Sequence, residues 1–388
     1  MRVYFGVCGI GLGHAGRCIP VAHKLLEKGD NIFFSTYSDA INYIQHEGFA
    51  FGKAPAIYFA VKPDGTVDFR KTTAYPGIFS TLIFLKQLQA ELKFMKYFKP
   101  DLVISDSRAS SIIAAKLLSI PIVTILNLYR VRIPREKRFL NLAQIADGGI
   151  LTLVGMVWNI SEEILIPDFP WPYTLSLNNL GISPWRESKV KLVGPIIQVK
   201  PEELPSEEQI RDKIGVKKNE LLIFVSISGP ISEKRHFITV MKKLVKRFPE
   251  NYKIIMSLAE PNSFNKPVRD KNVTIYPWIS NRFEFLKACD VVVSRAGLGT
   301  ISQAIYYGKP LVLIPTPSHT EQMNNARRAK ALNLATVLDQ RKLCYEALEM
   351  AIRETLSHKE KVLDVQRKVG KDDAINTILE IIATHRNP

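Results

Sequence analysis

Short apolar runs alternate with amphipathic segments along the first 130 residues of the chain. Residues Arg2–Val7, Asn31–Ser35 and Asp101–Ser105 form apolar runs of strand length, and a further run at Ile122–Leu126 follows a proline. Ala15–Lys28 carries its apolar residues at helical spacing, and residues 110–118 are also expected to be helical. Continuous short apolar runs are typical of parallel strands that helices cover on both faces.

The alternation stops in a polar stretch that contains Pro201 and Pro205, and then it starts again. The pattern predicts a second set of strands at Leu221–Ser226, Tyr252–Ser257, Val273–Tyr276, Val291–Val293 and Leu311–Ile314, with helices at Ser232–Arg247, Thr300–Tyr307 and Gln322–Leu332. The tail from Tyr345 onward is predicted to be helical. The predicted fold class is therefore α/β, with two Rossmann-like domains that face each other across a cleft.

The domain division follows from the length and from the polar break. A chain of 388 residues is too long for one ordinary core. We predict an N-terminal domain at 1–195, a linker with a short capped helix at 196–218, and a second domain at 219–365. The last segment, 366–388, is expected to form a helix that packs back on the N-terminal domain. Open parallel sheets bind ligands at the carboxyl ends of their strands, which here face the cleft.

The net charge indicates the kind of partner, and the cysteine content indicates the cellular compartment. The formal net charge of +16 indicates an anionic partner, such as nucleic acid, an anionic membrane face or a phosphate-bearing small molecule. Nucleic acid is not expected, because the charge is spread over both halves with no aromatic-basic strip. The four cysteines are scattered, which argues against a zinc site and favours a reducing compartment. With neither a signal-peptide pattern nor a membrane-spanning run, the expected location is the cytoplasm, at most peripheral to the inner face of the membrane.

A glycine-rich turn that contains Gly11 and Gly13 follows the first predicted strand and opens a helix. Glycines let the backbone approach a ligand closely, and a helix N-terminus favours negative charge. A dinucleotide-binding turn is the alternative, but it needs an acidic residue after the second strand. Residues 35–37 there are Ser-Thr-Tyr, and the glycines miss the usual register.

His14 ends this glycine turn and begins the helix. A histidine beside a helix N-terminus is expected to have a lowered pKa, which suits a neutral general base. A capping or packing histidine is the structural alternative. Asp106 ends a nearby parallel strand, so it either orients the His14 ring or caps the helix that follows it.

The segment Ser294–Gln322 combines a strand end, a glycine turn and a helix start. Gly297 and Gly299 permit the tight turn, and Thr300 is expected to cap the helix, whose free N–H groups suit a diphosphate. Arg295 adds a fixed positive charge. Glu321 and Gln322 begin the next helix, where they either cap it or bind sugar hydroxyls. The residues alone predict a site for an anion beside a polyol.

Four motifs in this order resemble those of GT-B glycosyltransferases. They are Gly11–Arg17, Leu221–Pro230, Tyr276–Ile279, and the run formed by Ser294–Thr300, Gly308–Pro310 and Glu321–Ala326. The pattern is most similar to the bacterial lipid II-forming N-acetylglucosaminyltransferase family and to the UDP-glycosyltransferases. Together the four cover both halves of the chain.

The resemblance implies a role for each matching residue. Trp278 and Ile279 would flank the base; Ser228, Gly229, Arg295, Gly297, Gly299 and Thr300 would surround the diphosphate; Glu321 and Gln322 would contact the donor sugar; Gly11, Gly13 and Arg17 would form the N-terminal loop; and His14 would be the base. Gln303 stands where these families usually hold a glutamate that binds both ribose hydroxyls. An amide can still bind a diol, but without the charge that strengthens such hydrogen bonds.

The function that the resemblance implies is inverting transfer of a hexose or N-acetylhexosamine from a nucleotide sugar, with UDP as the expected nucleotide. No tightly bound cofactor or metal is expected, since the chain has no DxD-like motif. The nearest alternative is an isomerase like the non-hydrolysing UDP-N-acetylglucosamine 2-epimerase. A nucleotide-sugar-binding or nucleic-acid-binding protein without catalysis is the alternative from another class.

The acceptor is expected to be lipid-linked or another glycan. Tyr75–Phe98 mixes apolar residues with Lys86, Lys93 and Lys96, and a basic cluster follows it in the sequence. This cluster contains Arg130, Arg132, Arg135, Lys137 and Arg138. An apolar strip beside basic residues is typical of docking on an anionic lipid surface. A buried helix followed by a solvated basic loop explains the same pattern.

Overall fold

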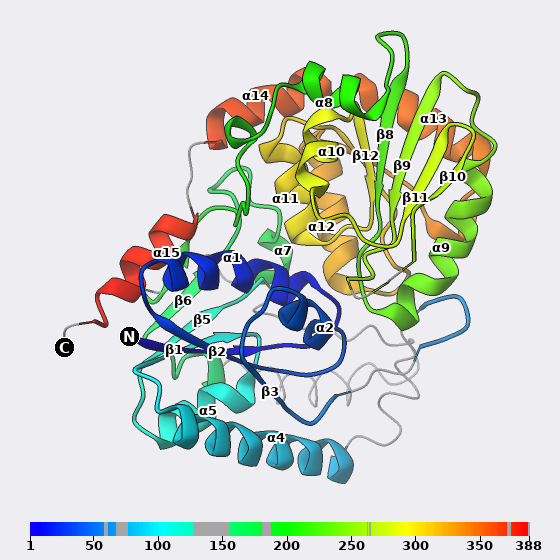
Figure 1. Cartoon of the computed structure of the whole chain (residues 1–388). Helices are drawn as coiled ribbons and strands as arrows, with labels where there is room; N and C mark the ends of the chain where they lie inside the picture. Colours follow the sequence, from blue (N-terminus) through cyan, green and yellow to red (C-terminus); the bar gives the residue numbers. More distant parts are fainter. Residues whose placement is uncertain are drawn as a thin grey trace.

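The chain folds around two seven-stranded sheets (Figure 1). The computed structural model describes residues 1–57, 61–66, 77–127, 156–180, 188–261, 263, 265–370 and 374–386, with only the backbone for 77–81. In both sheets the described strands run parallel, except that the edge strand β10 is antiparallel to its neighbour. This agrees with the predicted α/β class of two Rossmann-like domains.

The first sheet has the strand order β3-β2-β1-β4-β5-β6-β7. Its strands are β1 (Arg2–Val7), β2 (Asn31–Thr36), β3 (Phe51–Lys53), β4 (Leu102–Asp106), β5 (Ile122–Ile125), β6 (Glu163–Ile166) and β7 (Val190–Leu192). The order reverses direction between β1 and β4, where Val7 pairs with Asp106. Ligands of open parallel sheets bind at such switch points.

The second sheet repeats this arrangement, with the order β10-β11-β9-β8-β12-β13-β14. Its strands are β8 (Leu221–Ser226), β9 (Tyr252–Ser257), β10 (Val268–Asp270), β11 (Val273–Tyr276), β12 (Val291–Ser294), β13 (Leu311–Leu313) and β14 (Ala335–Val337). The switch point lies between β8 and β12, where Ser226 pairs with Ser294.

Helices cover the faces of both sheets (Figure 1). Those of the first half are α1 (Gly13–Glu27), α2 (Asp39–His46), α4 (Gly77–Phe98), α5 (Ala109–Leu117) and α7 (Leu177–Leu180). Those of the second are α8 (Glu207–Ile214), α9 (Ile231–Val245), α10 (Arg282–Ala288), α11 (Leu298–Tyr306), α12 (Thr320–Ala331), α13 (Tyr345–Leu356), α14 (Lys359–Val369) and α15 (Ala374–Ala383), with 3₁₀ turns at Pro201–Glu203 and Gln340–Lys342.

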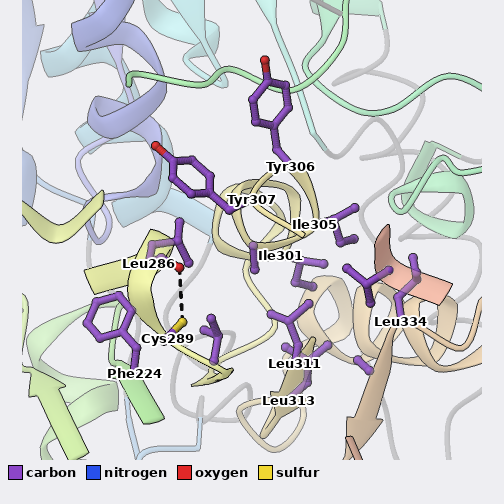
Figure 2. Close-up of a cluster of buried hydrophobic side chains, with 14 of the residues drawn as sticks. Phe224, Leu286, Cys289, Ile301, Ile305, Tyr306, Tyr307, Leu311, Leu313 and Leu334 are labelled. Carbon is purple, nitrogen blue, oxygen red and sulfur yellow. Dashed lines mark hydrogen bonds between the residues drawn. The ribbon is translucent and has the colours of Figure 1, made fainter. Parts of the chain in front are cut away.

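Buried apolar side chains fill the space between sheet and helices. Figure 2 shows one such cluster, in which Ile301 and Ile305 of α11 lie beside Leu311 and Leu313 of β13. Neither α11 residue has any exposed surface. Because these contacts fix the body of α11 against the sheet, its first turn is held at the carboxyl edge of β12.

The C-terminal helix α15 crosses back to the first half, as the sequence predicts. It lies beside α1 (Figure 1), and its apolar face belongs to the same buried cluster as β1 and α1. The two ends of the chain also meet at Asp30, which binds the N-terminal amine at 3.0 Å and the Arg386 guanidinium. The predicted boundary between residues 365 and 366 falls within α14, which continues to Val369.

The predicted strands agree closely with the observed ones. β1, β8, β9 and β11 have the predicted bounds. Helix starts deviate more, since α11 begins at Leu298 and α1 at Gly13, each two residues before the predicted start. None of the described helices combines the length and the apolar composition that a bilayer crossing requires.

The packing of α15 leads to a stability prediction. Ile378 has no exposed surface, so Ile378→Ala should leave a cavity and lower the free energy of unfolding by about 2–4 kcal/mol. Glu380→Ala on the exposed side of the same helix is the matched control and should cost less than about 0.5 kcal/mol. Urea denaturation followed by circular dichroism measures both. Equal stability of the two variants would contradict the packing of α15 on the first core.

Candidate active site

A cavity of about 290 Å³ lies between the carboxyl edges of the two sheets. The first half contributes the glycine loop after β1, with His14 and Arg17. The second half contributes the turns after β8, β11 and β12 and the start of α12. Most residues that the sequence assigns to a ligand line this one cavity: Gly11, Gly13, His14, Arg17, Ser228, Gly229, Trp278, Ile279, Gly297, Gly299, Thr300, Gln303, Glu321 and Gln322.

Three helix N-termini open toward this cavity without side-chain caps. They belong to α1 after Leu12, to α9 after Pro230 and to α11 after Gly297. All three of these capping positions, or the residues next to them, line the cavity. An uncapped N-terminus leaves backbone N–H groups without partners and carries the positive end of the helix dipole. The cavity is therefore suited to a multiply charged anion such as a diphosphate.

Thr300 does not cap α11, contrary to the sequence prediction. The helix begins two residues earlier, at Leu298, with Gly297 as its N-cap and no side-chain hydrogen bond there. A glycine N-cap has no side chain to satisfy the first-turn N–H groups. Those groups remain available to a ligand, and Thr300 lies within the first turn.

His14 and Asp106 meet at the edge of the first sheet. The Nδ1 of His14 lies 2.7 Å from Oδ1 of Asp106, which has no exposed surface. Arg17 donates to both carboxylate oxygens, with 2.5 Å from Nη2 to Oδ1, and the Cys18 thiol lies 3.4 Å from Oδ2. These contacts hold the pKa of Asp106 at about 2, since the charges of Arg17 and His14 outweigh the effect of burial. Asp106 does not cap α5, whose N-cap is Arg108.

The expectation of a lowered pKa for His14 is wrong. Burial does lower the pKa of His14, but the negative charges of Cys8 and Asp106 outweigh it and raise the pKa to about 10. The Cys8 thiol and the His14 imidazole shift each other's pKa. The pKa of Cys8 falls to about 7, because the charge of His14 and hydrogen bonds from His14 and Tyr37 outweigh burial. The prediction rested on the dipole at the helix N-terminus, and the sequence does not show that Cys8 and Asp106 lie next to His14.

Next to His14 and Asp106, hydrogen bonds connect the two halves of the chain. Arg17 donates to Oδ1 of Asn127 at 3.3 Å, and Nδ2 of Asn127 donates to Glu321 at 2.7 Å. Gln322 uses its Oε1 to accept from the backbone N–H of Thr316 at 2.8 Å. Gln322 thus orders the loop before α12, and its NH₂ group remains for a ligand. Asn127 is a site residue that no motif in the sequence marks.

Arg295 is a correction to the predicted site. Its side chain is only 2% exposed and does not line the cavity. The guanidinium lies against the Phe237 ring, 3.8 Å from its centroid, and donates to Ile314 O at 3.0 Å and to Gln340 Oε1 at 2.6 Å. Arg295 therefore supports the wall of the cavity from behind. The sequence placed it at a strand end but held no information on the direction of its side chain.

The far end of the cavity is formed by Trp278, Ile279, Arg282 and Gln303. Ile279 is 4% exposed, so it offers a ligand mainly its backbone. Trp278 contacts Tyr43 and His46 of the first half edge-on, with ring centroids 5.4 and 5.8 Å apart. Among the described residues, the Gln303 amide has no side-chain hydrogen bond and Arg282 has no carboxylate partner. Gln303 and Arg282 therefore offer polar groups for a ligand at this end.

Several residues that line the cavity were not predicted from the sequence. Arg282, Glu233 and His319 line the cavity along with Asn127. His319 is the N-cap of α12, where it accepts from Gln322 N at 3.4 Å. A histidine cap is not one of the usual capping signals, and Arg282 and Glu233 neither belong to a glycine turn nor follow a strand directly.

Part of the predicted acceptor region cannot be placed. The basic residues Arg130, Arg132, Arg135, Lys137 and Arg138 lie outside the described residues, as do Tyr75 and Pro76. The rest of the predicted apolar strip forms α4. No group of three or more His, Cys, Asp or Glu side chains arranged for a metal ion occurs in the described ranges.

Comparison with known proteins agrees with this architecture. Residues 233–378 match the glycosyltransferase family 28 C-terminal domain, and residues 1–146 match glycosyl transferase family 1. A Methanosarcina mazei protein named "uncharacterized glycosyltransferase" is 28% identical over 393 residues, which is 98% of each chain. A Desulforamulus reducens UDP-N-acetylglucosamine--N-acetylmuramyl-(pentapeptide) pyrophosphoryl-undecaprenol N-acetylglucosamine transferase is 28% identical over 213 residues, 50% of this chain and 56% of that protein.

Solved structures share the whole fold. The glycotransferase of kitacinnamycin superposes with a TM-score of 0.66 at 15% identity, over 99% of this chain and 98% of that one. The fold and the cleft thus define the GT-B class. With family matches in both halves, the chain is a glycosyltransferase.

The geometry around His14 predicts an unusual titration. The imidazole should titrate well above its ordinary pKa of about 6.5, because Cys8 and Asp106 stabilise its charged form. Cys8→Ser removes one of these negative charges and should lower the pKa of His14. Cys344→Ser is the control, since Cys344 is exposed at the start of α13 and serine can cap that helix equally well. NMR titration of ¹³C-labelled histidine measures the three pKa values; an unchanged value in Cys8→Ser would contradict the role of the thiol.

Proposed function

We propose that this glycosyltransferase moves a hexose or N-acetylhexosamine from a nucleotide sugar to an acceptor hydroxyl with inversion. The observation that carries the proposal is the placement of His14, held by the buried Asp106, in the same cavity as three uncapped helix N-termini. A base on one side and an anion site on the other are the two elements that displacement of a diphosphate requires.

His14 is the proposed general base. Its Nδ1 faces the Asp106 carboxylate, so in the neutral ring the proton resides on Nδ1 and Nε2 is free to accept one. The acceptor hydroxyl gives its proton to Nε2 while its oxygen attacks the anomeric carbon from the face opposite the diphosphate. The resulting imidazolium is stabilised by Asp106. The raised pKa of His14 means that the charged form prevails in the free enzyme at neutral pH, and only the neutral fraction can act.

The leaving diphosphate is met by backbone N–H groups rather than by Arg295. The first turns of α9 and α11 provide these donors, and the dipoles of both helices favour the charge that develops on the departing oxygen. Ser228 and Thr300 line the same region and offer hydroxyl donors. Glu321 and the free NH₂ group of Gln322 are the proposed contacts of the donor sugar.

UDP is the proposed nucleotide of the donor. Support comes from the matched C-terminal domain and from the UDP-N-acetylglucosamine named for the Desulforamulus reducens relative. The base lies between Trp278 and Ile279, and Gln303 faces the ribose. The amide holds the diol more weakly than a carboxylate does, and Arg282 adds donors nearby.

The proposed acceptor is lipid-linked or another glycan, reached from the cytoplasmic face of a membrane. The same relative is named for an undecaprenol-linked acceptor. On α4, Leu82 is 46% exposed and Leu85 is 51% exposed, and the exposed Lys86 is next to them. Exposed leucines beside a lysine favour contact with an anionic lipid surface.

Replacement of His14 tests the proposed chemistry. His14→Ala should lower kcat by a factor of about 10²–10⁴, since it removes general-base catalysis. The Kd of UDP should change less than about threefold, because the diphosphate is bound by helix N-termini. The control is His236→Ala, an exposed histidine on α9 that does not line the cavity. Activity is measured as UDP release from UDP-N-acetylglucosamine with membrane lipid extract as acceptor, and UDP binding by calorimetry. Full activity of His14→Ala would remove His14 from the role of base, and formation of an epimer without acceptor would indicate an isomerase.

Gln303 provides a test of the donor nucleotide. Gln303→Glu should tighten UDP binding about fivefold, because a charged acceptor forms a stronger hydrogen bond with the ribose hydroxyls. The gain should be smaller for dTDP, whose sugar lacks the 2′-hydroxyl. Calorimetric titration of both nucleotides into both proteins measures the difference. An equal gain for UDP and dTDP would contradict contact between residue 303 and the ribose 2′-hydroxyl.

A further inference from the structure

A second cavity, of about 360 Å³, adjoins the cleft. One wall is formed by the first half, with Ile10, Ser38, Asp39, Ile57 and Val61, and the other by the start of α9, from Pro230 to Arg235. Three residues (Ile10, Pro230 and Glu233) line both cavities. We call this second cavity the α9 groove.

The walls of the α9 groove are largely apolar. Ile10, Ile57 and Val61 line one wall, and Ile231 lines the other. Ile57 is 37% exposed and Ile231 is 48% exposed, although both are large apolar side chains. Single exposed apolar residues are ordinary, but several gathered in one concave site mark the binding place of an apolar group.

Polar residues also line the α9 groove, namely Ser38, Asp39, Ser232, Glu233 and Arg235, and of these we assign the contact with a ligand to Glu233. It is only 6% exposed, and in the described part of the chain its carboxylate has neither a hydrogen bond nor an ion pair. Burial raises the pKa of Glu233, while the charges of His319 and Arg295 lower it and that of Asp39 raises it. A buried carboxylate without a partner is costly unless a ligand supplies a donor.

The groove is preformed, because its first-half wall is fastened to the second half. Gly65, at φ +82°, lies so close to α9 that an added Cβ would be 2.4 Å from the carbonyl oxygen of Glu233. Nearby, Nε2 of Gln340 donates to Asp64 O at 3.1 Å, and the same amide accepts from Arg295 at 2.6 Å. Arg295, within the glycosyltransferase motif, thus helps to hold the segment that carries Val61.

We propose that the α9 groove binds the apolar part of the acceptor, and that Glu233 accepts a hydrogen bond from an acceptor hydroxyl where the two cavities join. Ile10 lies four residues before His14 in the same loop, so an acceptor held here projects its hydroxyl toward the base. The inference rests on the proposed function and deepens it. It commits the enzyme to an amphipathic acceptor, with a hydroxylated head and an apolar body.

Alkyl β-D-glucosides of increasing chain length test the proposal as binding probes, so no turnover is needed. Calorimetry in the presence of saturating UDP, below the micelle concentration, measures the Kd of the butyl, hexyl and octyl compounds. In the wild-type enzyme each methylene should tighten binding about threefold. A Kd that does not change with chain length would overturn the proposal.

Variants of residues in the α9 groove show whether the glucosides bind there. Ile57→Asp, at an exposed residue of the first-half wall that does not line the first cavity, should abolish the dependence on chain length. Val268→Asp is the control on the edge strand β10, where valine is 62% exposed, and should leave the dependence intact. Glu233→Gln should weaken every glucoside by a similar factor of about five, because it affects the head and not the chain.

UDP binding, measured on the same samples, distinguishes failure of the α9 groove proposal from failure of the proposed function. If UDP binds with the same Kd in the wild-type and Ile57→Asp proteins, the donor site and the fold are intact. Loss of the chain-length dependence in Ile57→Asp then supports the α9 groove, and its persistence in that variant rejects it. If the wild-type enzyme fails to bind UDP or any nucleotide sugar, the proposed function itself fails.

Discussion

The carboxylate of Asp106 is the group on which the site depends. It has no contact with water, and it is held by His14, Arg17 and Cys18. A buried carboxylate is stable only when its charge is matched and its oxygens are hydrogen-bonded, and removal of one partner leaves an uncompensated charge. Asp106 therefore fixes the His14 ring and the Arg17 side chain together. Arg17 donates a hydrogen bond to Asn127, and Asn127 donates one to Glu321 of the second half. The proposed base and the proposed sugar contact are thus ordered by one chain of hydrogen bonds.

A second connection between the halves begins at Arg295. Its guanidinium is buried at a cost that lowers its pKa to about 10, and it is stabilised by the Phe237 ring and by Gln340. Gln340 in turn holds Asp64 of the first half. One connection lies beside His14 and Asp106 and the other beside the α9 groove, so the two cavities share their framework. A change in either connection is expected to disturb the relative position of donor and acceptor before it disturbs either fold.

The sequence was informative where a physical rule acts locally. Strands such as β8 and β9 were predicted within their true bounds, since continuous apolar runs between turns have few alternatives. Orientation of the His14 ring was one of the two roles predicted for Asp106, because Asp106 ends a strand parallel to the one that precedes the His14 loop. Short edge strands such as β3 and β14, with three residues each, have no pattern long enough to detect. The starts of α1 and α11 were missed because Leu12 and Gly297, unlike the usual capping residues, give no side-chain signal.

Side-chain direction and charge environment lie beyond such rules, and Arg295 and His14 illustrate the two cases. Arg295 follows a strand at the ligand-binding edge, yet packing of Phe237 and the carbonyl of Ile314 draw it inward. His14 begins a helix, whose dipole alone would lower its pKa, yet Cys8 and Asp106 reverse the shift. A helix dipole acts as about half a charge, whereas each of these neighbours contributes a full one when ionised. The helix dipole is therefore the weaker influence on His14, and the three uncapped N-termini in the same cavity remain available to the proposed diphosphate.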